Sequence, residues 1–144
     1  MPDEETLYPF EVVLQGTPIA LQCKTGGTRE AWKERVKEAA RQRQRATYEL
    51  GFLDNRALAV TIYYFPSAPM EGDVDNIVKL IMDGMIGIAY LNDRVVERVT
   101  VQKFEPDGGW EFLVTSDRLA LALDTEPPAV YIRVEDDLSW RTIS

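Results

Sequence analysis

The sequence contains no histidine among its 144 residues. This absence excludes serine–histidine and cysteine–histidine nucleophile pairs, nucleases with a histidine general base, and histidine-ligated zinc. The single cysteine, Cys23, also excludes an internal disulfide framework and a zinc site built from several cysteines. Any catalysis must therefore rely on carboxylates, lysines, arginines, hydroxyls and a metal that oxygen ligands hold, such as Mg²⁺, Mn²⁺ or Ca²⁺.

Long hydrophobic runs are also missing, so we expect no membrane span. Residues 1–5 are acidic, whereas a secretory signal would begin with basic and then apolar residues. A composition of 45% hydrophobic and 28% charged residues is typical of a globular protein, and the length fits one domain over residues 1–144. The default expectation is a cytoplasmic location.

Positive charge is scarce, and the formal net charge is −8, which by itself argues against a polyanionic partner. The charges are segregated, however. Residues 29–45 contain seven basic and three acidic side chains, whereas the segment from residue 105 to the end contains nine acidic and three basic ones. The basic segment could therefore still contact phosphate.

Hydrophobic periodicity predicts the order of the elements. Strands are expected at residues 10–15, 58–64, 94–104, 110–115 and 129–134, with a hairpin turn at 107–109. A long helix is expected over 29–49, and a second helix from Asp75 or Asn76 to about residue 86. The pattern predicts an α+β fold with a small mixed or antiparallel sheet and two main helices. Residues 8–115 would form the core, and 116–144 an acidic C-terminal extension.

Three aspartates and one lysine are concentrated in residues 72–83, within otherwise apolar sequence. Unpaired charges are costly to bury, so these groups must pair with one another or hold a cation. On a helix, Asp75, Lys79 and Asp83 stand at i, i+4 and i+8 and form one polar stripe. The other faces of this helix are apolar. One small domain rarely surrounds such a helix completely, which favours a dimer.

The same cluster can hold a divalent metal. Asp73 and Asp75 lie two positions apart, so in extended geometry they face one side, and Asp93 would arrive from the start of the next strand. Mg²⁺ usually takes one or two carboxylates and keeps several waters, so three aspartates suffice for one ion or a metal pair. Lys79 could then stabilise a transition-state phosphate or orient the water nucleophile.

A simpler interpretation remains open for the individual residues. Asp75 and Asn76 could be helix caps, and Lys79 could pair with Asp75 and Asp83 along the helix. That interpretation gives no role to Asp73 or Asp93. An EF-hand is excluded, because Val78 stands at its glycine position and Gly84 at its closing glutamate.

The pattern Asp-x-Asp-Asn-x-x-Lys-x-x-x-Asp, followed by an aspartate that opens a strand, resembles the RusA-type Holliday-junction resolvases. The resemblance is dense from residue 72 to about residue 96. It implies a dimeric α+β fold and a bacterial or phage endonuclease that uses Mg²⁺ or Mn²⁺ to cut four-way DNA junctions. By position, Asp73, Asp75 and Asp93 would bind the metal, and Lys79 would act in catalysis with Asp75. The supporting positions would be Asn76, Asp83 and Asn92.

Six basic residues are candidates for contacts with DNA: Lys24, Arg29, Lys33, Lys37, Arg41 and Arg94. The alternative is a solvated helix face in which Lys33 and Lys37 pair with neighbouring glutamates. Asn92 stands where family members often carry aspartate, and the net charge is negative. A catalytically degenerate dimer that binds DNA or a protein therefore remains a competing function. In a third interpretation, the second helix is only a dimerisation element, and its polar stripe forms salt bridges between the two chains.

Overall fold

The computed structural model describes residues 8–20, 23, 26–47 and 55–141. The described strands form one mixed four-stranded sheet, in the order β1-β4-β2-β3. The strands are β1 (Phe10–Gln15), β2 (Leu58–Phe65), β3 (Val96–Lys103) and β4 (Ala129–Glu135). β2 and β3 run parallel, whereas β4 pairs antiparallel with both β1 and β2. The α+β class and the mixed sheet are confirmed.

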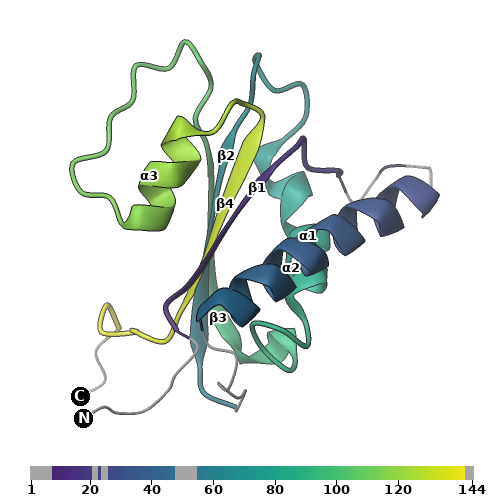
Figure 1. Cartoon of the computed structure of the whole chain (residues 1–144), viewed down its shortest axis with the longest axis vertical. Coiled ribbons are helices and arrows are strands. Elements are labelled where there is room, and N and C mark those ends of the chain that lie inside the picture. Colours follow the sequence, from purple (N-terminus) through teal and green to yellow (C-terminus); the bar gives the residue numbers. More distant parts are fainter. Residues whose placement is uncertain (1–7, 21–22, 24–25, 48–54, 142–144) are drawn as a thin grey trace.

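Helices lie on both faces of this sheet (Figure 1). α1 (Gly26–Thr47) and α2 (Val78–Met85) pack against each other on one face, and α3 (Asp117–Asp124) packs against β1 and β4 on the other. Successive side chains of β2 point to opposite faces of the sheet, so this strand contributes to the hydrophobic cluster on each face. Leu58, Val60 and Ile62 enter the larger core beneath α1 and α2, whereas Phe65 joins a smaller cluster with Leu119 of α3.

The predicted helices and four of the predicted strands are present: β1 has its predicted bounds, and the other elements have shifted ends. The helix expected over 29–49 begins at Gly26, and the part of it beyond residue 47 lies outside the described residues. The second helix starts earlier than expected, as a 3-10 helix (Val74–Ile77) that continues into α2. Among the described residues, no helix is both long enough and apolar enough to span a membrane.

The strand predicted at 110–115 is wrong, because these residues form an irregular loop. Trp110 and Phe112 have the period of a strand, but their rings pack in an aromatic cluster with Phe65 and Phe104 instead of joining a ladder. The position beside β2 is already occupied by β4.

The boundary of the core, predicted at residue 115, is also wrong, because β4 follows it and lies inside the sheet. β4 belongs to the segment expected to be an acidic extension, yet it lies between β1 and β2, and its Val130 and Ile132 are fully buried. The sequence interpretation also missed α3. The apolar faces of α2 are buried within the chain itself, so they no longer argue for a second copy.

Candidate active site

The acidic cluster lies where the chain passes from β2 to α2. Asp73 occupies the N-cap position of the 3-10 helix, but its side chain makes no capping hydrogen bond. Asp75 lies inside that helix together with Asn76, so neither residue is its N-cap, and capping does not explain them. Both Asp73 and Asp75 are exposed to solvent. Their carboxylates are therefore accessible to a ligand at the start of the helix.

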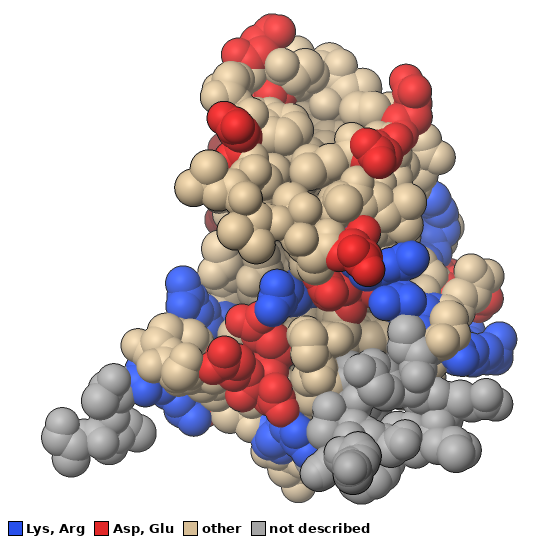
Figure 2. Space-filling model, turned by 60° about the vertical axis from the view of Figure 1, so that its left-hand side comes forward, with Lys and Arg blue, Asp and Glu red and all other residues tan. Residues whose placement is uncertain are grey.

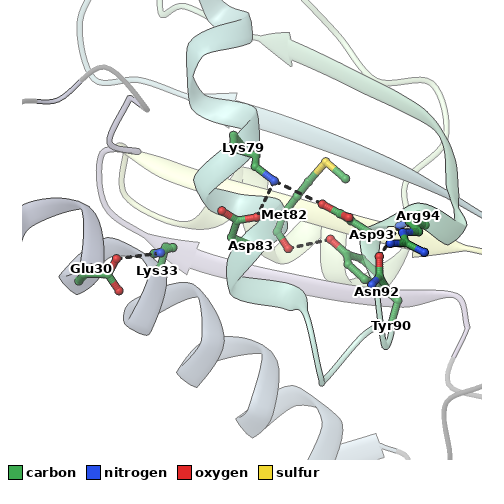
Figure 3. A network of polar contacts seen from close by, with 9 residues as sticks. All are labelled: Glu30, Lys33, Lys79, Met82, Asp83, Tyr90, Asn92, Asp93 and Arg94. Carbon is green, nitrogen blue, oxygen red and sulfur yellow. Dashed lines mark hydrogen bonds and ion pairs between the residues drawn. The ribbon is translucent and has the colours of Figure 1, made fainter. Parts of the chain in front are cut away.

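Lys79 lies between two carboxylates (Figure 3). Its Nζ is 3.0 Å from Oδ1 of Asp83, one turn further along α2, and 3.4 Å from Oδ2 of Asp93. Asp93 opens a short 3-10 helix (Asp93–Val95) that leads into β3. The predicted pairing of Lys79 with Asp83 is confirmed, and its second recorded partner is Asp93, where the simpler interpretation expected Asp75.

The two carboxylates keep Lys79 in its charged form. The hydrogen bond and charge of Asp83, followed by those of Asp93, raise the pKa of Lys79 above its usual value. An ammonium group with a raised pKa is a poor proton acceptor at neutral pH. Lys79 is half exposed, at 53% of its side chain, so its charge can also reach an incoming anion. The geometry thus suits charge stabilisation better than a role as general base.

Tyr90 anchors the segment that brings Asp93 to α2. Its fully buried hydroxyl donates a hydrogen bond to the Met82 carbonyl, 2.8 Å away, which ties the segment after α2 back to the helix (Figure 3). Burial and the nearby charges of Asp93 and Asp83 raise the pKa of Tyr90, so it remains a neutral donor. The sequence interpretation missed Tyr90. The one feature of the sequence that could have indicated Tyr90 is a tyrosine hydroxyl within an apolar run, three positions before Asp93.

Asn92 has a local structural role. Its Oδ1 accepts a hydrogen bond of 2.9 Å from the Arg94 backbone amide and caps the short helix that Asp93 opens. An aspartate at this position could make the same cap. The asparagine therefore preserves the backbone that presents Asp93 while removing one negative charge from the site.

The structure does not gather the three predicted metal ligands. Among the described residues, no three acidic side chains form a group that could hold a metal ion. The carboxylates that do converge are those of Asp83 and Asp93, and they converge on a cation, the Lys79 ammonium. Both carboxylates are partly exposed, and such a pair is a donor set that Mg²⁺ accepts, because this ion keeps several of its waters. The residues present therefore fit a hydrated divalent ion.

Most of the basic candidates on α1 contact their own chain. Arg29 donates to the Cys23 carbonyl, and Lys37 to the Ile86 carbonyl at 3.4 Å. Lys33 and Arg41 pair with glutamates of the same helix, Glu30 and Glu38. Figure 3 shows Lys33 on the part of α1 that lies along α2. The side chain of Arg94 is exposed beside the site, and Lys24 lies outside the described residues.

These features define the class of protein: a small α+β protein whose α2 presents a lysine between two aspartates. Residues 22–111, more than half of the chain, match the family model described as Endodeoxyribonuclease RusA. The chain therefore belongs to the RusA endodeoxyribonuclease family, which confirms the resemblance noted in the sequence and assigns the chain to a family of DNA endonucleases. No curated protein matches the chain. The matched residues include α1, β2, α2 and β3 and end before α3 and β4.

Proposed function

We propose that this protein is an endonuclease that uses Mg²⁺ or Mn²⁺ to resolve Holliday junctions or related branched DNA by phosphodiester hydrolysis. The observation that supports it most directly is the Lys79 ammonium held between Asp83 and Asp93, inside the segment matched to the family. A fixed positive charge beside accessible carboxylates suits a reaction in which negative charge develops on a phosphate.

Asp93 would be one ligand of the divalent ion, and Asp73 and Asp75, which the structure does not bring to the same point, would be the further ligands that the sequence pattern predicts. The ion would supply a Lewis acid for the scissile phosphate. Lys79 would offset the charge that develops on that phosphate. Asp83 would keep the lysine in place, since it makes the shorter of the two contacts and lies on the same helix. Asp93 could then turn from the lysine to the ion while Lys79 stays oriented.

The test is cleavage of a synthetic four-way junction with Mg²⁺ by the full-length chain. We expect Asp75→Asn to abolish cleavage without changing the thermal unfolding temperature, because the Asp75 side chain is exposed and makes no hydrogen bond or ion pair with the residues that the structure describes. Asp107→Asn is the matched control: it removes one exposed aspartate from the turn after β3, far along the chain from the site, and should leave cleavage unchanged. Full cleavage by Asp75→Asn would contradict the mechanism.

A catalytically degenerate, DNA-binding protein is the second candidate. It is favoured by Asn92, whose amide serves a backbone cap, and by the net charge of −8. The wild-type protein separates the two candidates. Junction binding without cleavage in Mg²⁺ and in Mn²⁺ would support the degenerate protein, whereas divalent-dependent cleavage would exclude it. Calorimetric titration with Mn²⁺ would measure metal binding independently of activity.

We further propose that the chain acts as a homodimer. Leu91 precedes Asn92 and Asp93, Val99 lies on the edge strand β3, and both remain well exposed although they are large and apolar. A second chain that covers them would lie close to Asp93 and bring two sites to one junction. Light scattering should give twice the chain mass, and Val99→Glu should halve it. Val114→Glu, at an exposed apolar residue of the loop before α3, should not change the mass.

A further inference from the structure

A pocket of about 400 Å³ lies directly beside Asp73. Its apolar walls come from three segments of the chain: Pro18 and Ala20, the loop after β2, and Ile77 of the 3-10 helix. Tyr64 is buried at this site, whereas Glu71 and Asp73 are exposed at its rim. The volume is within the range of about 300–1,000 Å³ that is typical of small-molecule sites. Of the proposed metal ligands, Asp73 borders this pocket, whereas Asp75, Asp93 and Lys79 do not.

The walls of this pocket are held in place by hydrogen bonds. The Met70 backbone amide donates to Oε2 of Glu105 at 2.9 Å, and the same oxygen pairs with Lys103 at 2.8 Å. Because Lys103 ends β3, the loop after β2 is fastened to the sheet. The Tyr64 side chain is hydrogen-bonded to that of Thr17, and burial raises its pKa, so it stays a neutral phenol. The pocket therefore has a preformed shape.

The charge and polarity of the residues that line the pocket indicate which kind of ligand it binds. Among the residues that the structure describes, no lysine or arginine lines the pocket, and two carboxylates, Glu71 and Asp73, stand at its rim. A phosphate would be repelled there. A flat, neutral heterocycle suits the apolar walls, and its polar edge could meet the Tyr64 hydroxyl or the Asn76 amide. Carboxylates also accept hydrogen bonds from exocyclic amino groups, such as those of cytosine and adenine, which thymine lacks.

We propose that this pocket binds one unstacked nucleobase with an exocyclic amino group, taken from the DNA strand that is cut. The inference rests on the proposed function, because it needs DNA at the site. Enzymes that do chemistry on a base read it, extruded from the stack, between aromatic and apolar side chains, and the same kind of recognition would suit an enzyme that selects its cutting site. Asp73 belongs both to the pocket rim and to the proposed ligand set, so a base held here sets which phosphate of its strand reaches Lys79. The pocket thus acts as the determinant of cutting sequence.

The test uses junctions that each carry one 2-aminopurine at successive positions around the cut, with Ca²⁺ present to prevent cleavage. We expect a severalfold rise in fluorescence at a single position, because 2-aminopurine brightens when it leaves the base stack. Ala20→Phe, which fills the pocket, should remove the rise. Ala120→Phe, at a partly buried alanine of α3, is its matched control and should retain it. Tyr64→Phe should reduce the rise, whereas Tyr63→Phe, on the opposite face of β2, should not.

The second readout is cutting sequence in Mg²⁺. Wild-type protein should cut several times faster with cytosine or adenine at the responsive position than with thymine, and Ala20→Phe should lose this preference. Two results would contradict the base pocket without contradicting the nuclease function. In the first, the wild type cleaves the junction but no 2-aminopurine position gives a rise in fluorescence. In the second, Ala20→Phe gives the same rise in fluorescence as the wild type. A rise that depends on Ala20 in a protein that never cleaves would support the pocket and overturn the proposed function.

Discussion

Lys79 is the residue on which the chemistry of the site depends. Its two carboxylate partners keep it charged, and its partial exposure leaves the charge available to a phosphate. We expect Lys79→Ala to lower the turnover of junction DNA by about 10²–10³-fold, the usual cost of removing one group that stabilises transition-state charge. Lys79→Arg should retain most of the activity, because arginine keeps the charge. Single-turnover cleavage rates measure both effects.

The pH dependence provides a separate check on Lys79. A raised pKa keeps this lysine protonated from neutral pH to beyond its usual value of 10.5, so its charge is lost only at higher pH. Between pH 7 and 10 the wild type and Lys79→Arg should therefore have parallel rate profiles. A wild-type profile that falls in this interval while that of Lys79→Arg does not would show that Lys79 loses its proton, and the assigned role would be wrong.

Spacing predicted part of the site at this scale. The i, i+4 relation of Lys79 and Asp83 follows from helix geometry, so their contact could be read from the sequence. Asp93 was expected at the cluster as a metal ligand, but its contact with Lys79 was not predicted, because that contact depends on how the chain turns after α2. Tyr90 makes that turn through a hydrogen bond to a backbone carbonyl, and such a bond leaves no pattern in the sequence.

At the scale of elements, the contact between α1 and α2 positions Lys79 over the sheet, and Gly84 allows it. A Cβ at Gly84 would lie 2.8 Å from both Cβ and Cγ1 of the fully buried Val36. Alanine would gain about 1 kcal/mol in helix propensity, but overpacking typically costs about 1–3 kcal/mol. Gly84→Ala should therefore destabilise the fold modestly, which urea denaturation would measure.

The rescue of this substitution tests its physical cause. Val36→Ala removes the contact with Cγ1 but keeps the contact with Cβ. If the clash is responsible, the double variant Gly84→Ala with Val36→Ala should therefore lose somewhat less stability than the sum of the two single variants. Strictly additive losses would exclude the contact with Cγ1 as the cause. A Gly84→Ala protein more stable than the wild type would show that helix propensity outweighs packing at this position.

Periodicity predicted β1, β2, β4, α1 and α2 because each buries a regular set of apolar residues. It failed between β3 and β4. Residues 110–115 alternate as a strand would, but aromatic packing determines their course. α3 is only eight residues long, and its clearest signal is Ser116, whose Oγ accepts a hydrogen bond from the Leu119 amide at the helix start. A short amphipathic pattern of that kind is easily taken for a loop.

At the scale of the whole molecule, the sheet depends on a strand that follows the segment matched to the family. β4 pairs with β1 on one side and β2 on the other, so without it β1 loses its place in the sheet. Three of its valine and isoleucine side chains (Val130, Ile132 and Val134) are fully buried. Each contributes about 1.5–3 kcal/mol by burial, which together is a large part of the roughly 5–15 kcal/mol that stabilises a domain.

We therefore expect a chain that stops after residue 127 to lack cooperative unfolding, although it retains every proposed catalytic residue and the whole family match. A chain that stops after residue 137 is the control, because among the described residues it loses mainly exposed contacts, such as those of Trp140 with Arg98 and of Arg141 with Glu97. Exposed ion pairs contribute about 0–1 kcal/mol, so this control should fold. Thermal melts followed by circular dichroism distinguish the two. A cooperative melt in the shorter chain would show that the rest of the fold is stable without β4.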